Sequence, residues 1–251
     1  KPLWQQYLLY LKSVLSGDFG PSFYFRDFSI NELFAASLPI SIRLGACALL
    51  LALVAGGFMG MIAALRQNRS TDYAMMTAAT IGVTIPNFVV APLLTLFFGV
   101  WLGLLPVGGW NNGAAQNMIL PIITLALPQI AVVARLTRGS MIEALRSNHV
   151  RTARAYGLSN YAVVVVHSLR GAILPVISYL GPAAAALLTG SVVIETIFGI
   201  PGIGRYFVQG ALNRDYTLVM GTVVVVAVFV IVFNLIVDVL YALLDPRVRY
   251  D

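Results

Sequence analysis

Long charge-free stretches constrain this chain more than any other feature of its sequence. Residues 44–65, 171–194 and 216–237 contain no Asp, Glu, Lys or Arg. A helix needs about 20 predominantly apolar residues to cross the roughly 30 Å of hydrocarbon in a bilayer. Each of the three stretches therefore predicts one transmembrane helix.

A fourth charge-free stretch, residues 73–134, is too long for a single crossing. It is interrupted at 101–113 by glycines, a proline and asparagines, and by tryptophans at positions 101 and 110. Such a patch is typical of a turn at a membrane interface, where tryptophan rings prefer to lie. We therefore expect two spans here, about 73–100 and 117–138. The total is five spans in an all-α, polytopic transmembrane helix bundle.

The composition agrees with a lipid environment. Hydrophobic residues make up 59% of the chain and charged residues only 10%, against about 25% charged residues in soluble domains. The net charge of +6 comes from short arginine clusters between the apolar stretches. This pattern is typical of cytoplasmic loops rather than of a nucleic-acid-binding surface. We expect membrane lipid, and no nucleic acid, among the partners.

Motifs for catalysis, metal binding and nucleotide binding are missing from the sequence. The single cysteine, Cys47, excludes an internal disulfide and a cysteine metal cluster. A phosphate-binding loop needs a lysine after its glycines, and neither Lys1 nor Lys12 follows such a loop. We expect no catalytic, cofactor-binding or metal-binding residue in this chain. His149 and His167 fit polar packing in or beside the longest loop.

Arginine placement predicts the orientation, because Lys and Arg are retained on the cytoplasmic side of a membrane. If the five spans alternate, ten arginines share one side: Arg66, Arg69, Arg135, Arg138, Arg146, Arg151, Arg154, Arg170, Arg247 and Arg249. We therefore expect a multi-pass membrane protein whose amino end lies outside and whose carboxyl end lies inside. Residues 1–38 would form an external segment, 39–245 the membrane domain and 246–251 a cytoplasmic tail.

The segment before the first span carries two helical signals. Apolar residues recur at helical spacing and predict a short amphipathic helix on the membrane surface: Leu3, Tyr7, Leu8, Leu11 and Leu15. Gly17 and Gly20 are expected to end it. Ser29 and Glu32 have the spacing of a capping box that would start the helix leading into the first span. A surface loop is the alternative for this pair.

Residues 139–170 form the longest loop on the arginine-rich side, and they are too polar to cross the membrane. Val150, Ala153 and Gly157 fall on one face of a helix, whereas Arg151 and Arg154 fall on another. A short helix of this kind, lying parallel to the membrane, can insert into a groove on a soluble partner. Gly157 is expected to end the helix.

Several motifs, in this order and at this spacing, resemble the peptide-permease family of bacterial ABC importers. They include GDFGPS at 17–22, IPNF at 85–88, ARLTRGS at 134–140, RTARAYGLS at 151–159, HSLRGAILP at 167–175, ETIFGIPGIG at 195–204, RDY at 214–216 and DVLYALLDPR at 238–247. The resemblance covers essentially the whole chain and is strongest to the permeases for oligopeptides. It implies a type I ABC importer permease fold, with a sixth span expected ahead of the external segment in the intact subunit.

The resemblance also implies a non-catalytic, multi-pass transport subunit of the bacterial inner membrane, with residues 1–38 in the periplasm and with several partners. A homologous second permease would complete a heterodimer, two cytoplasmic ATP-binding subunits would use ATP and Mg, and a periplasmic peptide-binding protein would deliver substrate. The implied ATPase-coupling residues are Glu143, Ala144, Val150, Arg151, Thr152, Ala153, Arg154, Ala155, Tyr156, Gly157 and Leu158. The implied dock for the binding protein is made by Gly199, Pro201, Gly202, Gly204, Arg214 and Asp215.

Substrate and mechanism are not fixed by these motifs alone. Tyr156 stands where peptide permeases usually have lysine, and permeases for dipeptides, nickel and glutathione share the same design. An ion-coupled secondary transporter is disfavoured, because the span interiors hold no Asp, Glu, Lys or His. A purely structural membrane anchor would not need an arginine-rich helix between spans. A path for many peptides is expected to have a small, apolar lining with few fixed charges.

Overall fold

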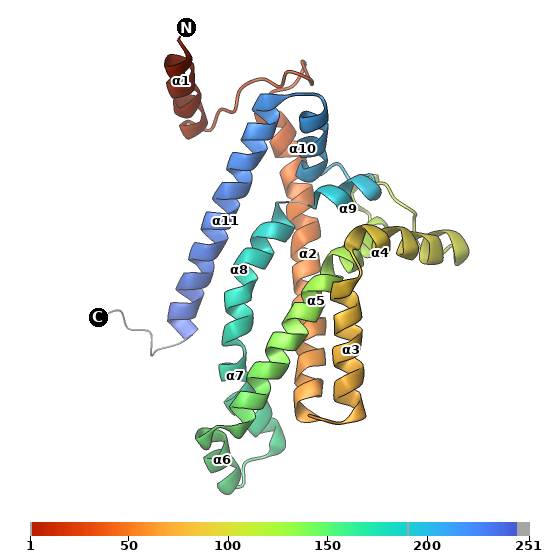
Figure 1. Cartoon of the computed structure of the whole chain (residues 1–251), viewed down its shortest axis with the longest axis vertical. Helices are drawn as coiled ribbons and strands as arrows, with labels where there is room; N and C mark the ends of the chain where they lie inside the picture. The colour runs from red at the N-terminus through yellow and green to blue at the C-terminus, as the bar shows by residue number, and fades with distance from the viewer. Residues whose placement is uncertain (1, 190, 245–251) are drawn as a thin grey trace.

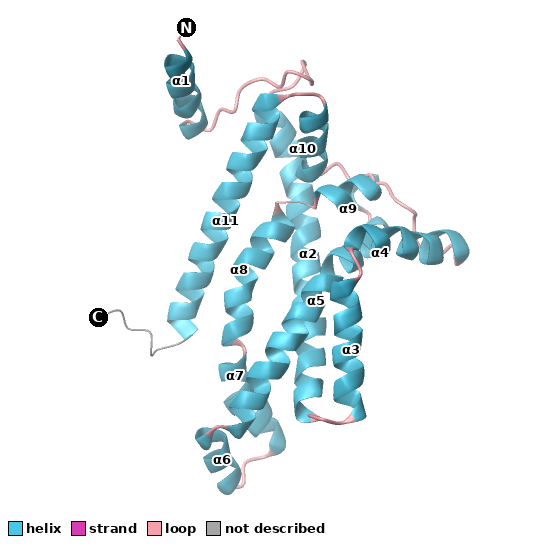
Figure 2. Ribbon diagram, in the orientation of Figure 1, coloured by secondary structure: helices cyan, strands magenta, loops and turns pink. Residues whose placement is uncertain are grey.

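The computed structural model describes residues 2–189 and 191–244. Within these ranges the chain is helical, without strands (Figure 2). The first half contains α1 (Leu3–Leu15), α2 (Ile30–Leu65), α3 (Ser70–Thr84), α4 (Asn87–Leu94), the π-helix η1 (Thr95–Trp101) and the 3-10 helix η2 (Asn111–Gly113). The second half contains α5 (Ala115–Arg146), α6 (Asn148–Ala155), the π-helix η3 (Ala162–Ser168), α7 (Leu169–Ala172), α8 (Leu174–Leu188), α9 (Val192–Ile197), α10 (Ile203–Leu212) and α11 (Tyr216–Leu244).

Four helical segments of the described chain are long and apolar enough to cross a membrane: Ile30–Leu65, Ala115–Arg146, Leu174–Ile197 and Tyr216–Leu243. They coincide with four of the five spans predicted from charge-free stretches, so the all-α membrane bundle is confirmed. The first of them starts well before the charge-free stretch, because α2 continues through Pro39 toward its capping residue Ser29. The predicted tail at 246–251 lies outside the described residues.

The remaining span, predicted at 73–100, is a broken pair of helices rather than one straight helix. α3 ends at Thr84, and the α4–η1 segment leaves it at an angle of 102° (Figure 1). Pro86 explains the break, since a proline has no N–H and forces the residue before it out of the helical region. Ile85 accordingly has an extended backbone, with φ −84° and ψ 120°. The described chain thus has four spans, or five if the bent pair counts as one.

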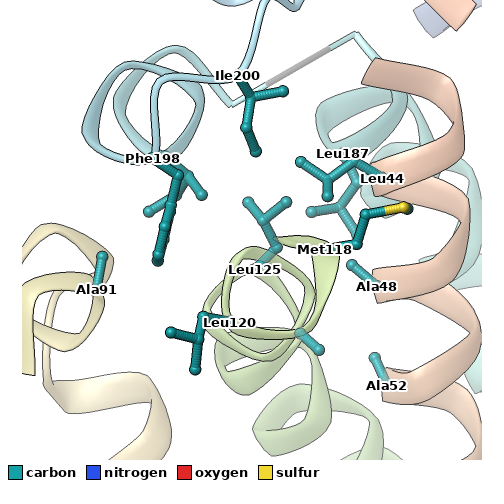
Figure 3. Close-up of a cluster of buried hydrophobic side chains, with 12 residues drawn as sticks. Leu44, Ala48, Ala52, Ala91, Met118, Leu120, Leu125, Leu187, Phe198 and Ile200 are labelled. Carbon is teal, nitrogen blue, oxygen red and sulfur yellow. The ribbon is translucent and has the colours of Figure 1, made fainter. Parts of the chain in front are cut away.

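Small residues let α2 and α5 pack with their backbones in close contact. A Cβ atom added to Gly56 would lie 2.8 Å from the Ile130 carbonyl oxygen, and one added to Gly60 would lie 2.5 Å from that of Ala134. Close backbone approach at small residues is the usual way in which helices associate in lipid. One hydrophobic cluster extends this contact: residues from α2 and α5 meet Ala91 of α4 and Phe198 (Figure 3).

The two ends of the bundle carry different short elements (Figure 1). α6 lies at one end, near the α2–α3 turn, and α10 lies at the other, near the start of α2. We refer to them as the α6 end and the α10 end. The predicted capping box is confirmed at the α10 end, where Ser29 Oγ accepts from the Glu32 amide and Glu32 accepts from the Ser29 amide. The amphipathic α1 is also confirmed, and none of its side chains is buried.

Candidate functional site

The α6 end presents a short helix that is joined almost directly to a membrane span. α5 ends at Arg146 and α6 begins at Asn148, so a single residue, Ser147, separates them. The extended backbone of Ser147 turns the chain, and its hydroxyl donates to the Ala144 carbonyl at 2.6 Å. Gly157 ends the helix with φ +75°, a conformation that favours glycine. The predicted terminator is therefore confirmed.

One face of α6 is buried inside the chain itself. Val150 is 0% exposed and Ala153 is 6% exposed, and both pack on Val163 of η3. Apolar side chains on an amphipathic helix bury against the nearest apolar surface, and here η3 provides it. Val150 and Ala153, both predicted as coupling residues, thus hold α6 in place, and a partner would meet the opposite face.

The outward face of α6 is basic and exposed. Arg151, Thr152, Arg154, Ala155, Tyr156, Gly157 and Leu158 are exposed, and we call these seven residues the α6 face. The Arg151 and Arg154 side chains make no hydrogen bond or ion pair with any residue in the described ranges. Of the two predicted residues on α5, Glu143 is exposed and Ala144 is half-buried. The α6 face therefore presents the guanidinium groups of Arg151 and Arg154 on a helix whose other side is packed against η3.

The side chain of His149 takes part in local polar packing, and His167 takes part through its backbone carbonyl. The Nε2 atom of His149 lies 3.1 Å from the His167 carbonyl oxygen and 3.5 Å from Ser147 Oγ. No cluster of three or more His, Cys, Asp or Glu residues that could hold a metal occurs in the described part of the chain. The histidine contact instead ties α6 to the end of η3.

An ion pair above α6 connects α5 to the α2–α3 turn. Arg138 of α5 donates to the two carboxylate oxygens of Asp72 at 2.6 and 2.7 Å, and Asp72 is 1% exposed. Asp72 also accepts from the Asn68 amide at 2.9 Å, which fixes the turn. Sequence reasoning missed this pair, although opposite charges at the same end of two neighbouring spans are a usable signal.

Comparison with protein-family models decides what kind of protein carries this surface. Residues 56–250 match the model described as "Binding-protein-dependent transport system inner membrane component". The chain belongs to this family. It is therefore an inner-membrane, multi-pass component of a transport system.

Named relatives of this transport component are similar over nearly its whole length. The chain is 52% identical over 250 residues to the oligopeptide transport system permease protein OppB of Haemophilus influenzae, covering 100% of this chain and 82% of that protein. It is 55% identical to OppB of Escherichia coli K12, covering 99% and 81%. The dipeptide transport system permease protein DppB of Bacillus subtilis is 46% identical, with coverage of 99% and 80%.

Solved structures confirm the predicted fold of this transport component. The methionine ABC transporter MetNI, in an inward-facing conformation, matches with a TM-score of 0.72 at 15% identity, covering 85% of this chain and 96% of the other. An amino acid ABC transporter matches with a TM-score of 0.60 at 19% identity, covering 86% and 94%. At these identities the likeness concerns the fold alone, which is that of an ABC importer permease.

At the α10 end of the transport component, a buried acid explains several predicted dock residues. Glu195 is 0% exposed and accepts from Ser41 Oγ at 2.6 Å and from the Gly204 amide at 2.9 Å. Gly202 and Gly204 are also buried, and a side chain on either would collide with the Glu195 carboxylate or its neighbours. The two glycines thus make room for Glu195, which binds the N-terminus of α10. We call Glu195 and Ser41 the α10 cap.

A second buried acid, Asp215, lies at the α10 end. Asp215 is 0% exposed and accepts from the Ser22 hydroxyl, from the Tyr24 amide at 3.1 Å and from the Leu218 amide at 3.1 Å. Burial alone would raise the pKa of Asp215, but these hydrogen bonds outweigh it and hold the pKa below the ordinary value. Asp215 therefore joins the start of α11 to the segment that follows α1.

The other predicted dock residues lie closer to the surface. Gly199 and Arg214 are exposed, and Pro201 is half-buried. Gly199 has φ +66° and Arg214 has φ +57°, so both stand at sharp turns. Of the six predicted dock residues, the three buried ones support the backbone, and only the remaining three can meet a partner directly.

Proposed function

We propose that this chain is the permease subunit of an ABC importer that carries peptides, oligopeptides foremost, across the inner membrane. The support is the identity to two oligopeptide permeases, 52% and 55%, which exceeds the 46% identity to a dipeptide permease. Dipeptide import is the second candidate and rests on that same relative. In this proposal the chain is a non-catalytic transport subunit, and partner subunits hydrolyse ATP with Mg.

The observation that carries the proposal is that the α6 face is exposed while the opposite side of α6 is packed on η3. Two cytoplasmic ATPase subunits drive the importer, and one of them binds the α6 face through Arg151 and Arg154. Because Val150 and Ala153 pack on Val163, a displacement of the face moves η3 with it. Because only Ser147 separates α6 from α5, the same displacement reaches a membrane span.

The remaining partners follow from this arrangement. The α6 end faces the cytoplasm and the α10 end faces the periplasm, as the arginine distribution predicts. A homologous second permease completes the membrane part as a heterodimer. A periplasmic peptide-binding protein docks at the α10 end, at the exposed turns of Gly199 and Arg214 and at the half-buried Pro201.

A transport assay tests the function directly. The chain is reconstituted in proteoliposomes with a second permease, two ATPase subunits and a peptide-binding protein, and uptake of a labelled tetrapeptide is followed. We expect uptake only when ATP and the ATPase subunits are present. Uptake that follows a proton gradient without the ATPases would reject the proposal, and uptake restricted to dipeptides would replace its substrate.

Cross-linking tests the coupling surface. Thr152→Cys and Arg154→Cys, each in a Cys47→Ala background, place a single thiol on the α6 face. We expect both to capture the ATPase subunit in intact membranes. Arg69→Cys is the matched control, because Arg69 is exposed in the α2–α3 turn at the same end of the bundle. Capture by the control but by neither α6 variant would reject the docking assignment.

A further inference from the structure

A polar contact bridges two spans inside the membrane. The Tyr179 hydroxyl of α8 donates a hydrogen bond to the side-chain oxygen of Gln129 of α5. Both side chains are half-buried, so each keeps an open side. Since the carbonyl of Gln129 accepts this bond, its amide nitrogen retains two N–H donors, and they have no partner among the described residues.

The depth of this contact follows from helix packing. Gln129 is followed by Ile130, whose carbonyl oxygen lies against Gly56 of α2. Gly56 stands near the middle of the charge-free stretch 44–65, and therefore near the middle of the hydrocarbon layer. The Gln129–Tyr179 pair thus lies deep in the membrane, far from both the α6 face and the α10 cap.

A free arginine lies on the same helix, between this pair and α6. Arg135 of α5 is exposed, and it has no hydrogen-bond or ion-pair partner within the described ranges. Arg135 follows Gln129 by six residues on α5, so its backbone lies about 9 Å further along the helix axis, toward α6. Arg138, one turn further, differs because Asp72 neutralises it. We call Gln129, Arg135 and Tyr179 the polar strip.

Hydrocarbon cannot be what covers the polar strip. Polar and charged groups inside a membrane face a bundle interior or a water-filled cavity, because exposing them to lipid is costly. The opposite face of α5 is already filled by α2, where Gly56 and Gly60 allow close contact. The open side of the strip must therefore meet water, solute or another protein chain.

We propose that the polar strip lines the peptide path, with Gln129 donating to main-chain carbonyl groups and Arg135 binding the C-terminal carboxylate. This inference rests on the proposed function and adds contact residues to it. The chemistry suits a permissive importer, because every unmodified peptide presents carbonyl groups and a carboxylate whatever its side chains. A fixed charge at Arg135 is then compatible with a path that otherwise has a small and apolar lining.

Thiol labelling tests whether the strip faces the path. In a Cys47→Ala background, Gln129→Cys is exposed to a membrane-impermeant, cationic thiosulfonate reagent in the assembled transporter. We expect modification, and we expect peptide-loaded binding protein with ATP to slow it severalfold. Ile231→Cys on α11 is the control, since Ile231 is 67% exposed on a wholly apolar stretch of its helix. A Gln129→Cys thiol as unreactive as this control would overturn the inference.

Peptide end groups test the role of Arg135. Uptake of trialanine is compared with uptake of its C-terminal amide, using the same binding protein for every permease variant. We expect Arg135→Gln to lower trialanine uptake by about tenfold relative to the amide, the effect of losing one hydrogen bond to a charged group. Arg135→Lys should restore part of this preference, and Arg69→Gln should leave it unchanged.

Each outcome separates this inference from the proposed function. Equal loss of both substrates in Arg135→Gln, or no loss of either, overturns the assignment of Arg135 while leaving ATP-driven peptide import intact. Labelling of Gln129→Cys that peptide does not slow indicates a water-filled contact with the second permease instead, and also overturns the proposal. Failure of the wild-type importer to take up trialanine and longer peptides would reject the proposed function itself.

Discussion

The α6 end and the α10 end place their polar residues in opposite ways. Within α6 the buried residues, Val150 and Ala153, are apolar, and the Arg151 and Arg154 guanidinium groups are exposed. At the α10 end Glu195 and Asp215 are 0% exposed and are satisfied from within the chain. The α6 face is therefore suited to binding another protein. The acids at the α10 end instead stabilise the loops of the chain itself. Substitutions at the two ends should accordingly separate binding from stability.

The largest effect is expected at the α10 cap. Glu195→Leu leaves the Ser41 hydroxyl and the first amides of α10 without their acceptor, and should lower the free energy of unfolding by about 3 kcal/mol. Thermal unfolding in detergent, followed by tryptophan fluorescence, measures the change. Glu143→Leu is the control at the α6 end, where the acid is exposed. Equal losses in the two variants would contradict the contrast between the ends.

The ion pair above α6 is expected to give the next largest effect. Asp72→Asn leaves Arg138 without its counter-ion, and because Arg138 is only partly buried the cost should be about 2 kcal/mol. The same thermal measurement applies, with Asp72→Glu as the conservative variant that retains the charge. A stability equal to that of the unmodified chain in Asp72→Asn would show that the pair contributes nothing.

Two substitutions within α6 should separate its two faces. Val150→Ala removes buried methyl groups and should lower stability by about 1 kcal/mol. Arg154→Ala should leave thermal stability unchanged, because this side chain has no partner in the described chain, yet it should weaken co-purification of the ATPase subunit. If Arg154→Ala destabilised the chain as much as Val150→Ala, the α6 face would not be a free binding surface.

The smallest effect concerns acidity at the α10 end. The folded pKa of Asp215 lies below its ordinary value of 3.8, so its contribution is fully present above pH 3.8 and is lost as the pH falls through the lower folded value. Between pH 7 and pH 5 no change is expected from this group. Limited proteolysis near Tyr24 at decreasing pH measures the loosening, and Asp215→Asn should remove the acid-dependent step.

Local sequence signals predicted the elements of this fold well. The charge-free stretches located four spans, the Ser29–Glu32 spacing located the start of α2, and Gly157 located the end of α6. Each of these features depends on neighbouring residues or on length and composition alone. That is why they can be read without knowledge of the tertiary structure.

Features that depend on distant contacts were not predictable in this way. Pro86 breaks a helix, whereas Pro39, Pro92, Pro121, Pro128 and Pro182 lie inside helices that continue. Proline alone therefore did not locate the 102° bend. Glu195 and Asp215 bind residues that are 154 and 193 positions away in sequence, so nothing local revealed their partners. Periodicity showed that α6 has two faces but not which of them η3 would cover.

The stretch of α5 from Gln129 to Arg146 has a mechanical consequence. It contains no proline, in contrast to the earlier part of the same helix, and at 1.5 Å per residue it forms a stiff rod about 27 Å long. Gln129 and Arg135 are fixed to this rod, and α6 is attached to its tip through Ser147. A twist of the rod about its own axis would turn both groups together. A rotation that starts at α6 would thus reorient the Gln129 amide, because α5 has no break between Gln129 and Arg146.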